Sequence, residues 1–175
     1  MEATTVSAIL APGSLLVLVA STAMAVVSGA PGAHEMRAFV LRRGPWLAFA
    51  IAAIAVTGSL YYSEIAHFTP CEMCWLQRGV MYPLAVILLV AAIRRDVNAW
   101  RYVIPIAALG LLFSTYHYQL ELFPEQPSMC STTVPCSVRF VEVYGFVSLA
   151  FMAGAVFISI IALHVAMLRA RRIVA

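Results

Sequence analysis

The sequence predicts an all-α membrane protein: an antiparallel four-helix transmembrane bundle with an additional N-terminal apolar helix. Three observations support this fold class. Of the 175 residues, 63% are hydrophobic and 11% are charged, whereas a soluble domain carries roughly 25% charged residues. Apolar stretches long enough to cross a bilayer alternate with short polar links. All eleven basic residues are arginines, and most of them cluster at the ends of these stretches.

Five apolar stretches occur along the chain, and each has the ~17 to 25 residues that a spanning helix needs. The first stretch ends at the breaker cluster Ser28-Gly29-Ala30-Pro31-Gly32. We expect it to form an extra helix within residues 1–36, followed by a four-helix membrane domain of residues 37–175. A removed leader or a dispensable extension is the alternative, although a secretory signal starts with basic residues and only Glu2 precedes this stretch. The expected helices cover about residues 6–28, 45–63, 70–93, 102–122 and 143–168.

The arginine clusters predict the orientation of the bundle. Cytoplasmic loops are enriched in Lys and Arg, which places the link 37–43, the turn 94–101 and the tail 169–172 inside. Alternation of the last four helices then places residues 64–78 and 122–142 outside. The protein is therefore expected to be a multi-pass protein of the inner or plasma membrane.

The four cysteines all fall in the two outer segments, as the pairs Cys71 with Cys74 and Cys130 with Cys136. This even, paired distribution is the one expected for disulfides on the oxidising side of a membrane. Five residues, one of them a proline, separate Cys130 from Cys136, and an internal disulfide is sterically allowed there. Such a disulfide is either a structural clip or one half of a thiol–disulfide relay with the other pair.

The first pair belongs to the stretch Cys71-Glu72-Met73-Cys74-Trp75-Leu76-Gln77-Arg78. Thr69 and Pro70 stand where an N-cap and a first-turn proline would stand, so both sulfurs are expected in the first turn of a helix. The positive end of the helix dipole favours thiolate there. Arg78 follows Cys74 by four residues and shares its helix face. A thiolate and a fixed cation at the membrane edge indicate redox chemistry.

Other interpretations of these residues are simpler. C-x-x-C is a common zinc-ligand spacing, and two pairs can make a four-cysteine site; however, cysteines in outer loops are more often oxidised than metallated, so we expect no metal. A static staple is a further alternative. Arg78 can simply snorkel to headgroups, and His117, near the outer end of its helix, can be a packed histidine. The net charge of +3 forms no patch and predicts no nucleic-acid partner.

The motif C-x-x-C-W-x-Q-R at the top of a membrane helix resembles the disulfide bond formation protein B (DsbB) family. The segment His117-x-x-Leu120-x-Leu122-aromatic-Pro124 is also similar to that family. The resemblance covers about residues 42 to 172. It implies a membrane thiol oxidant that re-oxidises a thioredoxin-like, DsbA-type partner outside the cytoplasm and passes the electrons to a membrane quinone, either menaquinone or ubiquinone.

The resemblance also implies roles for individual residues. The partner would attack the Cys130–Cys136 disulfide at Cys130, and Cys136 would exchange with the Cys71–Cys74 disulfide through Cys71. Cys74, released near Arg78, would reduce the quinone. Arg78 and, secondarily, the histidine of the second motif would line the quinone pocket.

Two features depart from the family's Gram-negative members. The second cysteine pair is closely spaced, which is more similar to short-loop members of Gram-positive type, and the N-terminal apolar stretch lies outside the usual four helices. A vitamin K epoxide reductase-like protein is the alternative among redox enzymes, but its loop pair precedes its C-x-x-C. A small transporter or assembly factor with a stapled loop is the alternative outside this class; transporters usually carry polar residues at mid-membrane, and the helix centres here are almost wholly apolar.

Overall fold

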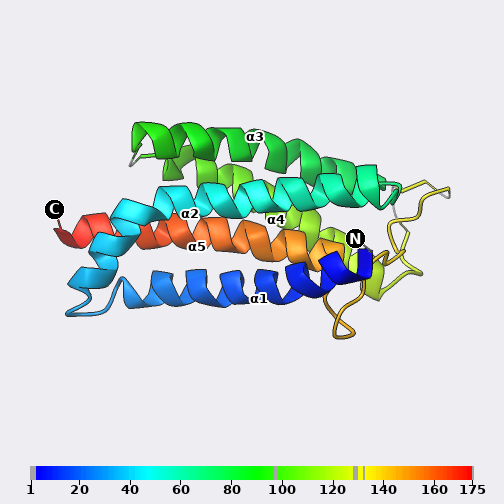
Figure 1. The fold of residues 1–175 in the computed structure, drawn as a ribbon, viewed down its shortest axis with the longest axis horizontal. Coiled ribbons are helices and arrows are strands. Elements are labelled where there is room, and N and C mark those ends of the chain that lie inside the picture. Colours follow the sequence, from blue (N-terminus) through cyan, green and yellow to red (C-terminus); the bar gives the residue numbers. More distant parts are fainter. Residues whose placement is uncertain (1–2, 97, 128–129, 132, 175) are drawn as a thin grey trace.

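A computed structural model of the chain describes residues 3–96, 98–127, 130–131 and 133–174. Within these ranges, five helices are long and apolar enough to cross a membrane, and they run side by side along the long axis of the molecule (Figure 1). The predicted all-α membrane fold is confirmed. The helices are Ala3–Val27 (α1), His34–Leu60 (α2), Glu72–Arg94 (α3), Trp100–Leu122 (α4) and Leu149–Val174 (α5).

Four of these helices form the bundle that the sequence predicts. α2 packs against α3, α3 against α4, α4 against α5, and α5 back against α2. α1 packs mainly against α5, on the outside of this bundle, and makes much less contact with α2 (Figure 1). Apart from Phe157, whose side chain is fully buried, the core between the helices consists of small and aliphatic side chains. Small residues such as Ala48, Ala52 and Ala107 allow this close packing.

α2 begins at His34, well before the predicted start at Pro45. The arginines at 37, 42 and 43 therefore belong to a helix rather than to a link. The first turns of α2 run obliquely before the helix turns parallel to its neighbours (Figure 1). Arg37 also donates hydrogen bonds to the carbonyls of Ser28 and Ala30 and so fixes the turn after α1. An apolar stretch marks the part of a helix that lies in lipid, not the place where the helix begins.

α5 begins at Leu149 instead of the predicted Val143. Val143 and Val147 exchange two backbone hydrogen bonds, each of 3.0 Å, across a tight turn. Tyr144 and Gly145 in this turn have φ values of 56° and 76°, a region that a helix does not use. The Ser148 hydroxyl then accepts a hydrogen bond from the Phe151 N–H at 3.2 Å, which is the usual capping contact of a helix start.

The chain ends are far apart, and the two loops with the cysteines lie at one end of the molecule. The N-terminus lies at this same end, whereas the turn between α1 and α2 and the C-terminus lie at the other end (Figure 1). α2 finishes near the cysteine end with a single π-helical turn, Tyr61–Ile65. All four cysteines, the end of α2 and the start of α1 are thereby brought to the same end of the molecule.

Candidate active site

The start of α3 differs from the prediction in one detail. Cys71, not Thr69, is the N-cap residue: its backbone is extended and its sulfur accepts a hydrogen bond from the Cys74 N–H at 3.4 Å. Thr69 and Pro70 remain outside the helix. The reason is that the Cys71 sulfur makes the capping contact with the third N–H of the helix, so the helix begins two residues later than a cap at Thr69 predicts. Cys71 is thus held at the positive end of the helix dipole.

The two thiols of this pair face one another. Their sulfur atoms are 2.9 Å apart, and both cysteines are in the thiol form. The hydrogen bond from the Cys74 thiol lowers the pKa of Cys71 to about 4, helped by His117 and the Cys74 N–H and opposed by burial. The sequence predicts the thiolate at Cys74, next to Arg78. In the structure, the groups that stabilise a thiolate converge on Cys71 instead.

His117 on α4 lies directly behind Cys71. The side chain is buried, with Nε2 3.6 Å from the Cys71 sulfur and Nδ1 3.2 Å from Gln77 Nε2. An amide nitrogen is only a donor, so Nδ1 of a neutral imidazole accepts from Gln77 and Nε2 carries the hydrogen that points at the sulfur. Gln77 is a site residue to which the sequence analysis gave no role; its position three residues after Cys74 is the signal that could have identified it.

A cavity of about 380 Å³ opens on the other side of the C-x-x-C pair. Apolar side chains from α1, α2, α3 and α5 line most of it. Its polar part includes Cys74, Gln77 and Arg78. The described residues that line it do not include Cys71 or His117, so the histidine contacts the thiol pair rather than the cavity. The prediction that Cys74 and Arg78 share a face is borne out by their common position on this wall.

Arg78 is held in place by a neighbouring helix. Its Nε donates to the Ser59 hydroxyl and its Nη2 to the Ser59 carbonyl, both at 2.9 Å. The guanidinium also lies over the Trp75 ring, 5.3 Å from the ring centroid, a cation–π arrangement. These contacts aim the cation along the cavity wall instead of out to the surface. Ser59 lies in α2, and nothing in its sequence position signals this contact.

The second pair, Cys130 and Cys136, forms a disulfide with a Cα–Cα distance of 6.0 Å. Cys136 is buried and Cys130 is half-buried. Both pack in one cluster with Cys71 and with Leu120 of α4, so the short second loop brings the two pairs together. The disulfide also removes two of the four thiolates that a four-cysteine zinc site needs. The ligand atoms of the first pair and His117 do lie within 4.8 Å of one another.

Glu72 joins the loop to the start of α3. Its Oε1 accepts a hydrogen bond from the Ser131 N–H at 3.1 Å, and its carboxylate lies within 4.8 Å of the sulfurs of the loop disulfide. The sequence does not predict this role for Glu72, because the contact depends on how the second loop folds back. This contact links the loop that carries the disulfide to the start of α3.

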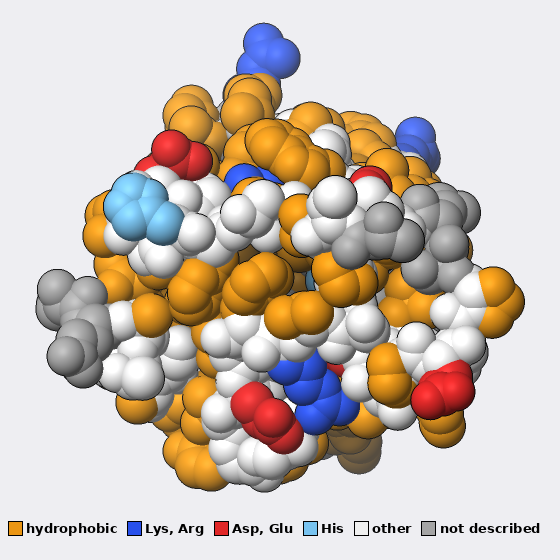
Figure 2. Space-filling model, turned by 90° about the vertical axis from the view of Figure 1, so that its right-hand side faces the viewer, with side chains coloured by type: hydrophobic (Ala, Val, Ile, Leu, Met, Phe, Trp, Pro, Cys, Tyr) orange, Lys and Arg blue, Asp and Glu red, His pale blue; other side chains and the backbone are white. Residues whose placement is uncertain are grey.

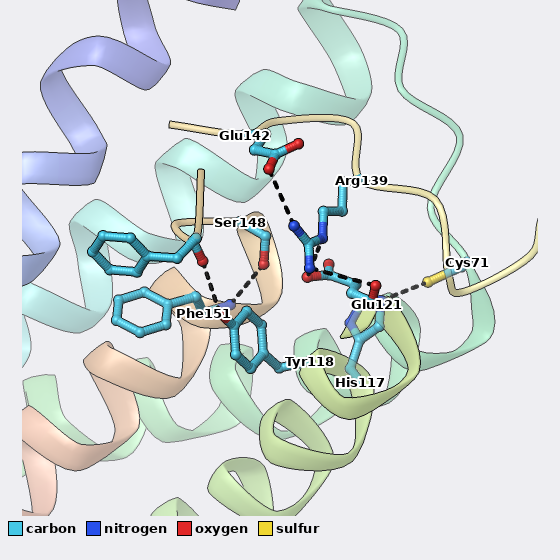
Figure 3. A network of polar contacts seen from close by, with 9 residues as sticks. Cys71, His117, Tyr118, Glu121, Arg139, Glu142, Ser148 and Phe151 are labelled. Carbon is cyan, nitrogen blue, oxygen red and sulfur yellow. Dashed lines mark hydrogen bonds and ion pairs between the residues drawn. The ribbon is translucent and has the colours of Figure 1, made fainter. Parts of the chain in front are cut away.

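A network of polar contacts holds the rest of the loop against the end of α4 (Figure 3). Arg139 donates to Glu142 at 3.2 Å and to the Glu121 carbonyl at 3.4 Å, and its Nε lies 3.9 Å from the Glu121 carboxylate. Glu121 is buried one helical turn beyond His117. The Tyr118 hydroxyl donates to the Phe146 carbonyl at 3.0 Å. The loop is thus tied to the helix that carries the histidine.

The cysteine end of the molecule has few charged side chains on its surface. Figure 2 shows mainly apolar and neutral polar atoms there, with a few acidic, basic and histidine side chains between them. The exposed apolar residues of the second loop and its flanks are Leu122, Phe123, Val138, Phe140, Tyr144 and Phe146. An exposed apolar surface of this kind suits contact with another protein or with the membrane interface.

Comparison with known proteins places the chain among proteins of disulfide bond formation. The family model described as disulfide bond formation protein DsbB matches residues 42–168. A probable disulfide formation protein of Oceanobacillus iheyensis is 46% identical over 121 residues, which are 67% of this chain and 83% of the relative. Disulfide bond formation protein C of Bacillus subtilis is 41% identical over 118 residues, 66% of this chain and 86% of the relative. No solved structure matches the chain.

The matched region spans all of α3 and α4 and most of α2 and α5, together with both cysteine pairs. This match favours the DsbB-type interpretation over the vitamin K epoxide reductase-like alternative and over a transporter or assembly factor. The protein is a multi-pass membrane disulfide oxidoreductase, and the chain belongs to the DsbB family of disulfide bond formation proteins.

Proposed function

We propose that this protein oxidises a thioredoxin-like, DsbA-type partner outside the cytoplasm and passes the electrons to a membrane quinone. One observation carries the proposal. The C-x-x-C pair lies between a loop disulfide on one side and an apolar cavity with a cation on the other. Such an arrangement separates the exchange of disulfides with a protein from the reduction of a small acceptor.

The cavity fits a quinone by size and by chemistry. Ligand pockets measure about 300 to 1,000 Å³ and are mostly apolar with a few polar groups, and this cavity has about 380 Å³. Three of its lining rings are stacked: Tyr62 on Phe68 at 5.8 Å and Phe68 on Phe140 at 5.2 Å. A guanidinium has five N–H donors, and among the described residues Ser59 takes two of those of Arg78. The remaining donors would be available to hold a quinone oxygen.

The relay begins at the more accessible sulfur of the loop disulfide. Cys136 is buried and Cys130 is half-buried, so a partner thiolate reaches Cys130 more readily. Attack there forms a mixed disulfide between the partner and Cys130 and releases Cys136 as a thiolate. The second thiol of the partner then displaces Cys130, and the partner leaves in its oxidised form.

The electrons next move from the loop to α3. Cys136 attacks the Cys71 sulfur of a Cys71–Cys74 disulfide and releases Cys74. Cys130 then displaces Cys71 from Cys136, which restores the loop disulfide and leaves both thiols of the helix reduced. The low pKa of Cys71 favours this last step, because a thiol of lower pKa leaves faster.

The cavity completes the cycle. A quinone bound there supplies an acceptor for the two electrons and two protons of the reduced pair. Cys74 is the cysteine that lines the cavity, Arg78 provides the positive charge at its wall, and His117 holds a proton against the Cys71 sulfur. The residues that would contact the quinone are therefore Cys74 and Arg78, with Gln77 linking the cavity to the histidine.

The chemistry requires both cysteine loops to face the outside of the inner or plasma membrane, because cytosolic reductants would keep all four thiols reduced. The arginine clusters support this orientation, since positively charged segments remain in the cytoplasm. The apolar surface beside the loop disulfide is the proposed docking face for the partner (Figure 2). Residues 37–175 would form the catalytic membrane domain, with residues 1–36 added to it.

The test is a coupled assay with the purified protein, a reduced thioredoxin-like protein and a soluble quinone. Two thiols should disappear for each quinone that is reduced, and both Cys71→Ser and Cys74→Ser should abolish this turnover. The proposal is wrong if wild-type protein oxidises the thiols without consuming quinone, or if both serine variants keep full turnover.

A further inference from the structure

The first helix contributes to the cavity although it lies outside the part of the chain that matches the family. The match begins at residue 42, whereas α1 ends at Val27. Five residues of α1 nevertheless line the cavity: Ile9, Leu10, Gly13, Ser14 and Val17. They supply a part of the wall, as do Cys74 and Arg78 of α3.

Two close contacts fix the register of this wall against α2. Ser7 and Tyr62 share a buried hydrogen bond of 2.8 Å. Farther along, the Leu10 side chain lies so close to Gly58 that a Cβ at Gly58 would be 3.2 Å from it. Each helix advances by 1.5 Å per residue, so Gly13 lies about 5 Å deeper in the membrane than Leu10, away from the cysteine end.

The wall has an open space at Gly13. A Cβ at this position would meet no atom within 4 Å, and the residue lines the cavity. Arg78 is fixed at Ser59, which lies next to Gly58 in the chain. The space at Gly13 is therefore deeper than the cation and is bounded by apolar side chains such as Ile54, Ala55 and Val17.

We propose that α1 is part of the acceptor site and selects prenylated quinones, with the polar ring against Arg78 and the hydrocarbon chain passing Gly13. This inference rests on the proposed quinone function. In this chain, α1 would add a wall to the acceptor site, and this wall lies outside the four helices that match the family. The N-terminal stretch thereby has a role in substrate binding, rather than that of a dispensable extension.

The test fills the open space and measures binding. In Gly13→Leu, the leucine side chain would occupy the path of the hydrocarbon chain. Because the two groups cannot fill the same space, the variant should bind a prenylated quinone about tenfold or more weakly. Two quantities are measured on the full-length protein: the quinone that co-purifies from membranes, and the Kd for a prenylated quinone from quenching of tryptophan fluorescence. A ring-only quinone should bind Gly13→Leu with nearly unchanged Kd.

Gly79→Leu is the matched control. Gly79 is also a helical glycine with no atom within 4 Å of its Cβ position, but it is exposed and is not among the residues that line the cavity. It should keep wild-type binding of both quinones. If Gly13→Leu does not fold, the pair Gly13→Ala and Gly79→Ala decides, with a smaller loss of prenylated quinone expected only in the first.

The outcomes separate this inference from the function on which it rests. If wild-type protein binds and reduces prenylated quinone and the Gly13 variants match the Gly79 variants, α1 has no part in the site and the inference is overturned. If Gly13→Leu weakens ring-only and prenylated quinones equally, the proposed path of the hydrocarbon chain is wrong. If wild-type protein binds no quinone, the proposed function itself fails.

Discussion

Cys71 is the side chain on which most contacts of the site converge. It caps α3, faces the Cys74 thiol and touches His117. Each contact places a donor against its sulfur, and together they stabilise the Cys71 thiolate that leaves when Cys130 displaces Cys71 from Cys136. The sequence identified the pair but could not assign this role, because His117 lies on another helix and its approach depends on how α4 packs.

The pKa of Cys71 can be measured directly. In the reduced protein, the thiolate absorbance that is lost in Cys71→Ser should titrate with a midpoint near 4, as the hydrogen-bonded sulfur requires. The thiolate is thus present above this pH and lost as the pH falls through it. His117→Ala should move the midpoint upward, because one stabilising donor is removed. A midpoint near the ordinary thiol value of about 8.5 would contradict this assignment.

We expect Arg78 to contribute to the reduction of quinone and not to the stability of the fold. Arg78→Ala should lower kcat/KM for quinone by roughly 10-fold to 100-fold, the effect of losing a charge-assisted hydrogen bond of about 1.5–3 kcal/mol. Arg172→Ala removes an exposed arginine at the far end of the molecule and serves as the control. Unchanged quinone kinetics in Arg78→Ala would reduce Arg78 to an interfacial anchor.

Among the glycines, Gly110 has the least room for a side chain. A Cβ at Gly110 of α4 would lie 2.2 Å from the ring of Phe157 in α5, which is itself fully buried. Gly110→Ala should therefore destabilise the bundle by about 1–3 kcal/mol through overpacking, seen as a lower Tm in detergent. Gly79→Ala adds the same methyl group to open space and should leave Tm unchanged.

A second substitution tests the cause of this loss. Phe157→Leu in the Gly110→Ala background removes the ring that the new methyl group meets, and the double variant should recover part of the lost stability. If the stability losses of the two single variants simply add in the double variant, contact between the new methyl group and the Phe157 ring is not the cause of the loss.

Helix types and their order could be predicted from composition, but several boundaries could not. The apolar stretch at 45–63 located α2 in the membrane, yet the helix extends back to His34 because arginines are good helix formers outside the lipid. The stretch from Val143 looked helical because it is apolar, and the turn at Tyr144 and Gly145 overrides this pattern. Long-range contacts such as Arg78 with Ser59 carry no local signal at all.

Orientation in the membrane is the property of the whole molecule on which the function depends. In a cysteine-free background, a single cysteine that replaces Glu125, in the loop between α4 and α5, should react with a membrane-impermeant maleimide in intact cells. A single cysteine at Asn98, in the turn between α3 and α4, should react only after the membrane is opened. Both positions are exposed in the structure, so access to the reagent depends on the side of the membrane. The reverse pattern would invert the topology and remove the oxidase function.

In the proposed relay, electrons pass from the loop pair to the helix pair through Cys136 and Cys71, which are buried in one cluster. The variant with Cys74→Ser and Cys130→Ser retains only these two cysteines. After mild oxidation, mass spectrometry of a non-reduced digest should find them joined in a disulfide. The variant with Cys71→Ser and Cys136→Ser should keep Cys74 and Cys130 as thiols. A Cys74–Cys130 disulfide with Cys71 and Cys136 still free would contradict the relay.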